Sequence, residues 1–173
     1  MKRLFLIAVA AVIAFSAGAQ NAKLTGSFEE LKDVTLIDAT VDFDNGVYKF
    51  LPEATYAEQN ADWEQTKKET MERFMSGLNK TLKLTHKAAV TTQVQDYTIE
   101  VEVRNVDDKG NVLSDVVISD KKGKAIAEIT NLYGKGGRFG TFTNLMGDGM
   151  ESTGEKIGRM ISYSLLKKKY IDK

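Results

Sequence analysis

The chain has 173 residues, with 24 Lys plus Arg against 24 Asp plus Glu, and it contains no cysteine. Balanced charges of both signs along the chain disfavour a nucleic-acid partner, because duplex binding needs a basic surface that neutralises phosphates. The absence of cysteine excludes disulfides, so we expect a fold that depends on a hydrophobic core of its own.

Residues 1–19 have the pattern of a secretory signal peptide. Lys2 and Arg3 precede an apolar run over 4–15, and Ala17-Gly18-Ala19 predicts cleavage before Gln20. The run is shorter than the ~20 residues that span a bilayer as a helix. We therefore expect an exported protein, periplasmic or extracellular, with no transmembrane segment after cleavage and one domain over 20–173.

The first predicted element of the domain is a strand over 35–43, where apolar and polar residues alternate. Asp44-Asn45-Gly46 then predicts a tight turn. The acids around this turn invite comparison with a calcium-binding EF-hand loop, but counting from Asp42 puts Gly46 at position 5 instead of 6. The mismatch favours solvated acids at a strand end, and we predict no metal site.

A helix is predicted next, because apolar residues recur at three- and four-residue steps while charged residues fill the other side. Asn60 or Asp62 can cap its start. Docking on a sheet explains this stripe more simply than a ligand pocket does. Its members are Trp63, Met71, Phe74, Met75, Leu78 and Leu82.

Three strands are predicted to follow as an antiparallel meander over 97–104, 112–119 and 124–132, joined by turns at 107–111 and 120–123. A weaker strand is predicted within 85–94. His86, the chain's one imidazole, lies at its start. With no second nucleophile or metal ligand nearby in sequence, His86 favours a surface or structural role, and we predict no catalytic residue.

Residues 133–144 form the most unusual segment, with four glycines among basic and aromatic residues. It lacks the Gly-Lys-Ser/Thr of a phosphate loop, and Phe139 stands where a dinucleotide-binding loop needs its third glycine, so no cofactor is predicted. Two hypotheses remain open. Either the loop recognises a partner or an anion at the start of the last helix, or it is a crossover whose aromatics cover the core edge. The candidate binding residues are Lys135, Arg138, Phe139 and Phe142.

The last predicted helix covers 145–169 and points Met146, Met150, Ile157, Met160, Ile161, Ser164 and Leu165 inward. Gly147, Gly154 and Gly158 each cost ~1 kcal/mol relative to alanine in a helix, which indicates close packing. Gly154 and Gly158 would let this helix approach the sheet or a second helix.

The predicted order is β-α-β-β-β-α. Two helices can then cover the apolar face of one sheet, so the sequence predicts an α+β two-layer sandwich with a mainly antiparallel sheet.

This pattern resembles small exported envelope proteins of Gram-negative bacteria whose function is unassigned. The strand Leu36–Asn45, the helix start Asp62-Trp63-Glu64, the meander and the run from Gly134 to Gly149 carry the resemblance. The order of elements is also similar to the amino-terminal domain of TolB and to the periplasmic domains of curli-secretion-type assembly factors. The resemblance implies an envelope role and transfers no catalytic residue.

Together these observations favour a non-enzymatic exported interaction or assembly module of the cell envelope, with an envelope protein as partner. Self-association is compatible with this function. The predicted contact surfaces are the loop from Lys135 to Phe142 and an exposed sheet edge, which can accept a partner's strand. The alternatives are a small-ligand-binding protein with a pocket between helices and sheet, and a hydrolase whose Ser, Asp or Glu residues meet only in three dimensions.

Overall fold

The computed structural model describes residues 22–82, 87–89 and 95–171. The predicted signal peptide and His86 lie outside these residues. In chain order the elements are β1 (Lys23–Gly26), a 3₁₀ turn (Glu29–Leu31), β2 (Leu36–Asp42), β3 (Val47–Tyr48), β4 (Leu51–Pro52), α1 (Glu53–Gln59), α2 (Trp63–Leu82), β5 (Lys87–Ala89), β6 (Tyr97–Val106), β7 (Val112–Asp120), β8 (Ala125–Gly134) and α3 (Phe142–Ile171).

Within the described residues, eight strands form one sheet with the path β1-β8-β7-β6-β2-β5, while the short β3 joins β6 and pairs with β4. The meander β6-β7-β8 is antiparallel, as predicted. β2 instead runs parallel to β6. This follows from the helices between them, because a strand that returns after a helical crossover re-enters the sheet in the same direction. The sheet is therefore mixed, with antiparallel pairs in the meander, between β1 and β8 and between β3 and β4.

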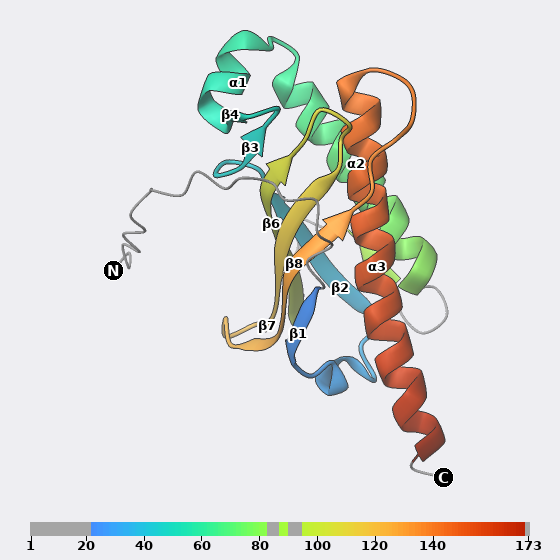
Figure 1. Cartoon of the computed structure of the whole chain (residues 1–173). Helices are drawn as coiled ribbons and strands as arrows, with labels where there is room; N and C mark the ends of the chain where they lie inside the picture. The colour runs from blue at the N-terminus through green and yellow to red at the C-terminus, as the bar shows by residue number, and fades with distance from the viewer. Residues whose placement is uncertain (1–21, 83–86, 90–94, 172–173) are drawn as a thin grey trace.

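The α+β two-layer class is confirmed, since α2 and α3 lie side by side on one face of the sheet (Figure 1). The sequence did not predict β1, the β3–β4 hairpin or α1. Only Lys87–Ala89 of the weaker predicted strand lies within the described residues. Asp62 does stand at the start of α2, because its carbonyl accepts from the Thr66 amide. The Asn60 side chain instead donates to Tyr56 O at the end of α1.

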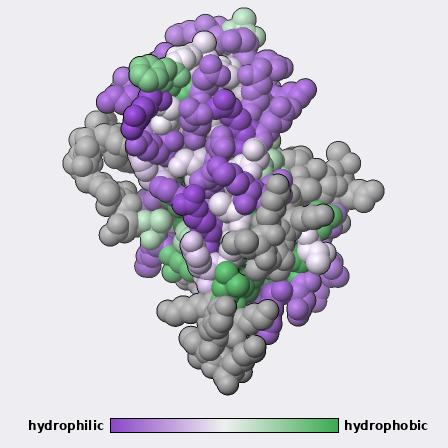
Figure 2. Space-filling model, turned by 90° about the vertical axis from the view of Figure 1, so that its right-hand side faces the viewer, coloured by the Kyte–Doolittle hydropathy of each residue, from purple (hydrophilic) through white to green (hydrophobic). Residues whose placement is uncertain are grey.

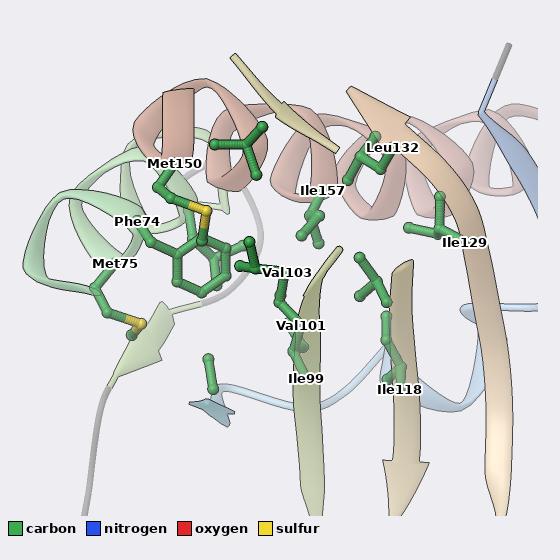
Figure 3. Packing of buried hydrophobic residues seen from close by; sticks show 14 of the residues in the cluster. Phe74, Met75, Ile99, Val101, Val103, Ile118, Ile129, Leu132, Met150 and Ile157 are labelled. Carbon is green, nitrogen blue, oxygen red and sulfur yellow. The ribbon is translucent and has the colours of Figure 1, made fainter. Parts of the chain in front are cut away.

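The core lies between the sheet and the two long helices (Figure 3). Ile99, Val101 and Val103, at alternate positions of β6, are fully buried, which agrees with the strand predicted over 97–104. Side chains from α2, α3 and the meander point toward one another in this layer. They include Phe74, Ile118, Ile129, Leu132, Met150 and Ile157. None of the helices among the described residues combines the length and apolarity that a membrane span requires.

Glycines bring α3 into backbone contact with α2. A Cβ atom on Gly154 would lie 2.3 Å from Phe74 O, and one on Gly158 would lie 2.0 Å from Thr81 Oγ1. From the other helix, a Cβ on Gly77 would lie 2.1 Å from Glu151 O. These distances confirm that the predicted glycine stripe allows close packing, and they identify the second helix as the neighbour.

The inward positions of α3 are largely as predicted, with one error. Met146, Met150, Ile157 and Ile161 are fully buried, and Met160 and Leu165 are partly buried. Ser164 was predicted to face inward but is exposed. Ser162 is the buried serine instead, at 3% exposure, and its Oγ donates to Thr81 O over 3.1 Å. Because α3 packs against α2 as well as against the sheet, its stripe of buried residues is wider than contact with the sheet alone would give.

Replacing Gly154 with alanine should lower the free energy of unfolding by about 1–3 kcal/mol, because the new methyl group meets backbone that cannot move aside. The matched control is Gly147→Ala, where the neighbour is the side chain of Arg73, which is ion-paired with Asp148 but can shift more readily than backbone, so the cost should be smaller than at Gly154. Urea unfolding of both variants measures the difference. Equal stability of the two variants would contradict the close-packing account.

Candidate interaction surface

An aromatic cluster organises the end of the molecule where α2 begins. Trp63 is only 2% exposed, and its ring lies edge-on to Tyr48 at 4.6 Å and to Tyr56 at 5.1 Å between centroids. Its Nε1 donates to Glu53 Oε1 over 2.6 Å. Aromatic pairs of this geometry add stability beyond their buried area. The cluster therefore fixes the β3–β4 hairpin and α1 against the start of α2.

The ionisable side chains around this cluster are held by hydrogen bonds or ion pairs, so their roles are structural. Burial, followed by the charge of Glu53, raises the pKa of Tyr48, whose hydroxyl stays protonated and donates to Phe43 O over 2.8 Å. Burial alone would lower the pKa of Lys67, but hydrogen bonding and attraction to Glu64 together with the charge of Glu53 outweigh it and raise that pKa. Neither group is free to transfer protons near neutral pH.

Phe142 extends this cluster to the start of α3. Its ring centroid lies 5.6 Å from that of Tyr56, and Lys49 Nζ lies 5.2 Å from its centroid. The side chain is partly buried against the core. Phe142 therefore fits the hypothesis that this segment is a crossover whose aromatics cover the core edge. It joins α3 to α1 and to the turn of the β3–β4 hairpin.

The loop between β8 and α3 has its backbone fixed at successive residues. The Lys135 amide donates to Ser152 Oγ at 3.2 Å, the Gly136 amide to Asn111 Oδ1 at 2.9 Å, and the Gly137 amide to Leu145 O at 3.2 Å. A Cβ on Gly136 would lie 2.1 Å from Lys109 O, so only glycine allows this approach to the β6–β7 turn. The loop follows a defined path.

Three of the four predicted binding residues face solvent on this loop. Lys135 and Arg138 are exposed, and Phe139 is 88% exposed. We call these three residues the tip. The structure separates them from Phe142, which packs inward. The side of the molecule on which α3 and this loop lie has a mostly hydrophilic surface in its upper part (Figure 2).

The anion hypothesis for this loop gains little support from the start of α3. The Thr141 hydroxyl accepts from the Asn144 amide at 3.3 Å, and the Thr141 carbonyl accepts from the Leu145 amide at 3.0 Å. Thr141 thus caps the helix and occupies donors that an anion would use. A partner that contacts side chains of the tip fits this arrangement better.

A second exposed aromatic lies in the turn of the β3–β4 hairpin. Phe50 is 79% exposed and has a φ of 72°, while the preceding Lys49 has a φ of 49°. Two positive φ angles in a two-residue hairpin turn normally require Asn-Gly. The turn lacks glycine and its two strands are two residues long, so the sequence gives almost no signal for this hairpin.

The face of the sheet opposite the helices, here called the open face, is acidic. Its side chains alternate along each strand with the buried residues of the helix-covered face. Asp42, Glu102 and Asp115 lie in one row across β2, β6 and β7. Among the residues whose side chains the structure describes, the carboxylates on this face are Asp38, Asp42, Glu100, Glu102, Asp115 and Glu128, against the cations Lys23 and Arg104.

A shallow groove of about 450 Å³ lies near the start of β2 and β6 and contains two acids. Asp96 forms an ion pair with Lys121 at 2.9 Å, in which both side chains are largely exposed. Asp33, the second acid, is also exposed. The groove thus lacks the enclosed, convergent acids that general acid–base catalysis uses. No cluster of three or more metal-ligating side chains occurs in the described part of the chain.

Comparison with known proteins finds no matching family model and no matching curated protein. Among solved structures, the PelC dodecamer from Paraburkholderia phytofirmans is 10% identical, covers 82% of this chain and 96% of its own, and has a TM-score of 0.42. An uncharacterized protein is 15% identical over 73% of this chain and 90% of its own, with a TM-score of 0.42. A Xanthomonas campestris protein assigned to DUF330 is 10% identical over 80% of this chain and 87% of its own, with a TM-score of 0.37.

These low identities and TM-scores assign neither a family nor a function to the chain. The predicted likeness to the amino-terminal domain of TolB, to curli-secretion-type domains and to envelope proteins stays a prediction. In the structure itself, the tip, Phe50 and the open face carry exposed side chains that the packing of the fold does not account for.

Replacing Phe50 with glycine should raise the free energy of unfolding by about 1 kcal/mol, because glycine adopts a positive φ without the steric cost that phenylalanine incurs. Phe50→Ala is the matched control, since it removes the same ring but keeps the Cβ atom. Thermal and urea unfolding should rank glycine above alanine. The opposite order would show that the turn is not strained.

Proposed function

We propose that this protein is a non-enzymatic, exported interaction or assembly module of the cell envelope that binds a protein partner through the tip. The observation that carries this proposal is Phe139, an aromatic side chain that is 88% exposed and follows three residues with hydrogen-bonded amides, Lys135 to Gly137. Aromatic and arginine side chains dominate binding energy at protein interfaces. The hydrogen bonds at Lys135, Gly136 and Gly137 restrain the segment that leads to Phe139, which reduces the conformational entropy that the loop loses on binding.

The exposed sheet edge at β1 is the second predicted contact surface. All four residues of β1 are exposed, and its pairing within the described residues is with β8 on one side. The other edge of such a strand carries backbone donors and acceptors that an added strand can use. The tip remains the primary surface, because its aromatic is the most exposed of the large apolar side chains among the described residues and two exposed cations accompany it.

The alternative functions find less support. A ligand pocket between helices and sheet would occupy the layer where Phe74, Met150 and Ile157 pack together (Figure 3). A hydrolase would need the open groove with Asp33 and Asp96 to assemble a reactive site, although Asp96 is already paired with Lys121. If the tip binds no protein partner, the ligand-binding and hydrolase functions become the favoured ones.

Cross-linked affinity purification from the envelope fraction of cells that express the full chain tests the proposal. We expect Arg138→Ala combined with Phe139→Ala to reduce capture of the specific partner at least tenfold. Both residues are exposed, so the variant should keep the unfolding midpoint of the wild type. Phe142 is left intact, because its loss would disturb packing against Tyr56.

Tyr163→Ala serves as the matched control, since this residue is an exposed aromatic on α3, at 67% exposure, outside the tip. It should capture the partner as the wild type does. Equal capture by the wild type and the folded tip variant would refute the proposal and return attention to the enzymatic and ligand-binding alternatives.

A further inference from the structure

The chain carries two surfaces of opposite character that its own fold leaves unpartnered. Within the described residues, no ion pair engages Lys135 or Arg138 of the tip, and none engages Glu100 or Glu128 of the open face. The full chain has 24 basic and 24 acidic residues, and the predicted cleavage before Gln20 removes Lys2 and Arg3, which leaves 22 against 24 and a net charge of −2. A net charge this small repels other copies only weakly, so cations on one surface and carboxylates on another can attract each other between copies.

The centre of the open face has a specific composition. Val117 of β7 points outward at 37% exposure between the buried Val116 and Ile118. In the register of the sheet, Glu100 of β6 lies directly opposite Val117 on one side, and Glu128 of β8 lies opposite it on the other. Side chains directly opposite on neighbouring strands stand about 5 Å apart. The open face thus presents an apolar spot between two exposed carboxylates.

The next row of the open face strengthens its negative potential. Asp42, Glu102 and Asp115 follow one another across three strands, and like charges at such positions repel. Arg104 offsets part of this repulsion by donating to Asp115 Oδ2 at 3.1 Å and to Asn131 Oδ1 at 3.2 Å. Glu102 itself remains exposed. A cation from outside would relieve the remaining repulsion.

The tip has the complementary pattern, an exposed phenyl ring accompanied by cations. We propose that the tip of one copy docks on the open face of a second copy, with Phe139 on Val117 and Arg138 and Lys135 toward Glu100 and Glu128. This proposal rests on the proposed function, because it identifies the first partner of the tip as another molecule of this chain. Because the tip and the open face are different surfaces, the contact is head-to-tail and can repeat.

Sedimentation velocity across a concentration series tests this docking on protein purified from cells that express the full chain. The wild type should form species larger than a monomer, and raising the salt from about 50 mM to about 500 mM should weaken association about tenfold by screening the charges. Arg138→Ala with Phe139→Ala removes the tip, and Glu100→Lys with Glu128→Lys reverses the open face. Each variant alone should be monomeric.

Mixing the two variants gives the decisive result. The tip variant retains its open face and the open-face variant retains its tip, so the mixture should form a one-to-one heterodimer and nothing larger. Tyr163→Ala should assemble as the wild type does. Circular dichroism and the unfolding midpoint establish that every variant is folded. Val117→Ser provides a second open-face variant, one that changes no charge.

A monomeric wild type at every concentration would overturn the head-to-tail inference. If, with a monomeric wild type, the tip variant still failed to capture an envelope protein other than this chain, the proposed function would stand without self-association. Self-association of the open-face variant alone would likewise overturn the inference, because it would indicate a symmetric contact between tips. A tip variant that captured and assembled as the wild type would refute both proposals.

Discussion

The close approach of α3 to its neighbours is the constraint on which the rest of the structure depends. Glycines allow it on both sides, since Gly154 meets the backbone of α2 and Gly149 meets the β6–β7 turn at Gly110 O. Interiors packed this tightly transmit small changes in volume. Because the loop before α3 is bonded to the same turn through Asn111, the position of the helix also sets the position of the tip.

This constraint explains why an aromatic can be both exposed and well placed. Phe142 anchors the first turn of α3 on the aromatic cluster, whereas Phe139, three residues earlier, stands in solvent. The backbone is held on both sides of Phe139, by the amides of Lys135 to Gly137 and by the carbonyl of Thr141, which reduces the entropy lost when a partner immobilises the ring. The open face adds the complementary half, with an apolar residue between carboxylates. The packing of the core therefore sets the positions of the tip and the open face, although neither surface is part of the core.

The sequence predicted the elements whose patterns are long. Alternation over β6 and helical periodicity over α2 and α3 reflect burial on one face, which extends over many residues. The β3–β4 hairpin escaped because two-residue strands have no period, and its turn uses Lys49 and Phe50 where glycine would have been a signal. The tip residues were found as a set, but the inward turn of Phe142 depends on Tyr56, more than eighty residues earlier. The composition of the open face could not be predicted from the sequence, because it depends on which residues of neighbouring strands lie opposite one another.

The absence of cysteine in the natural sequence allows the central claim to be tested directly by disulfide trapping. Phe139→Cys and Val117→Cys, each introduced alone and then mixed under mild oxidation, place one thiol on the tip and one on the open face of different copies. The head-to-tail account predicts a cross-linked dimer that joins the two variants, with Tyr163→Cys replacing Phe139→Cys as an unreactive control. A mixture that yields no such heterodimer, or links to Tyr163→Cys as readily, would contradict the account.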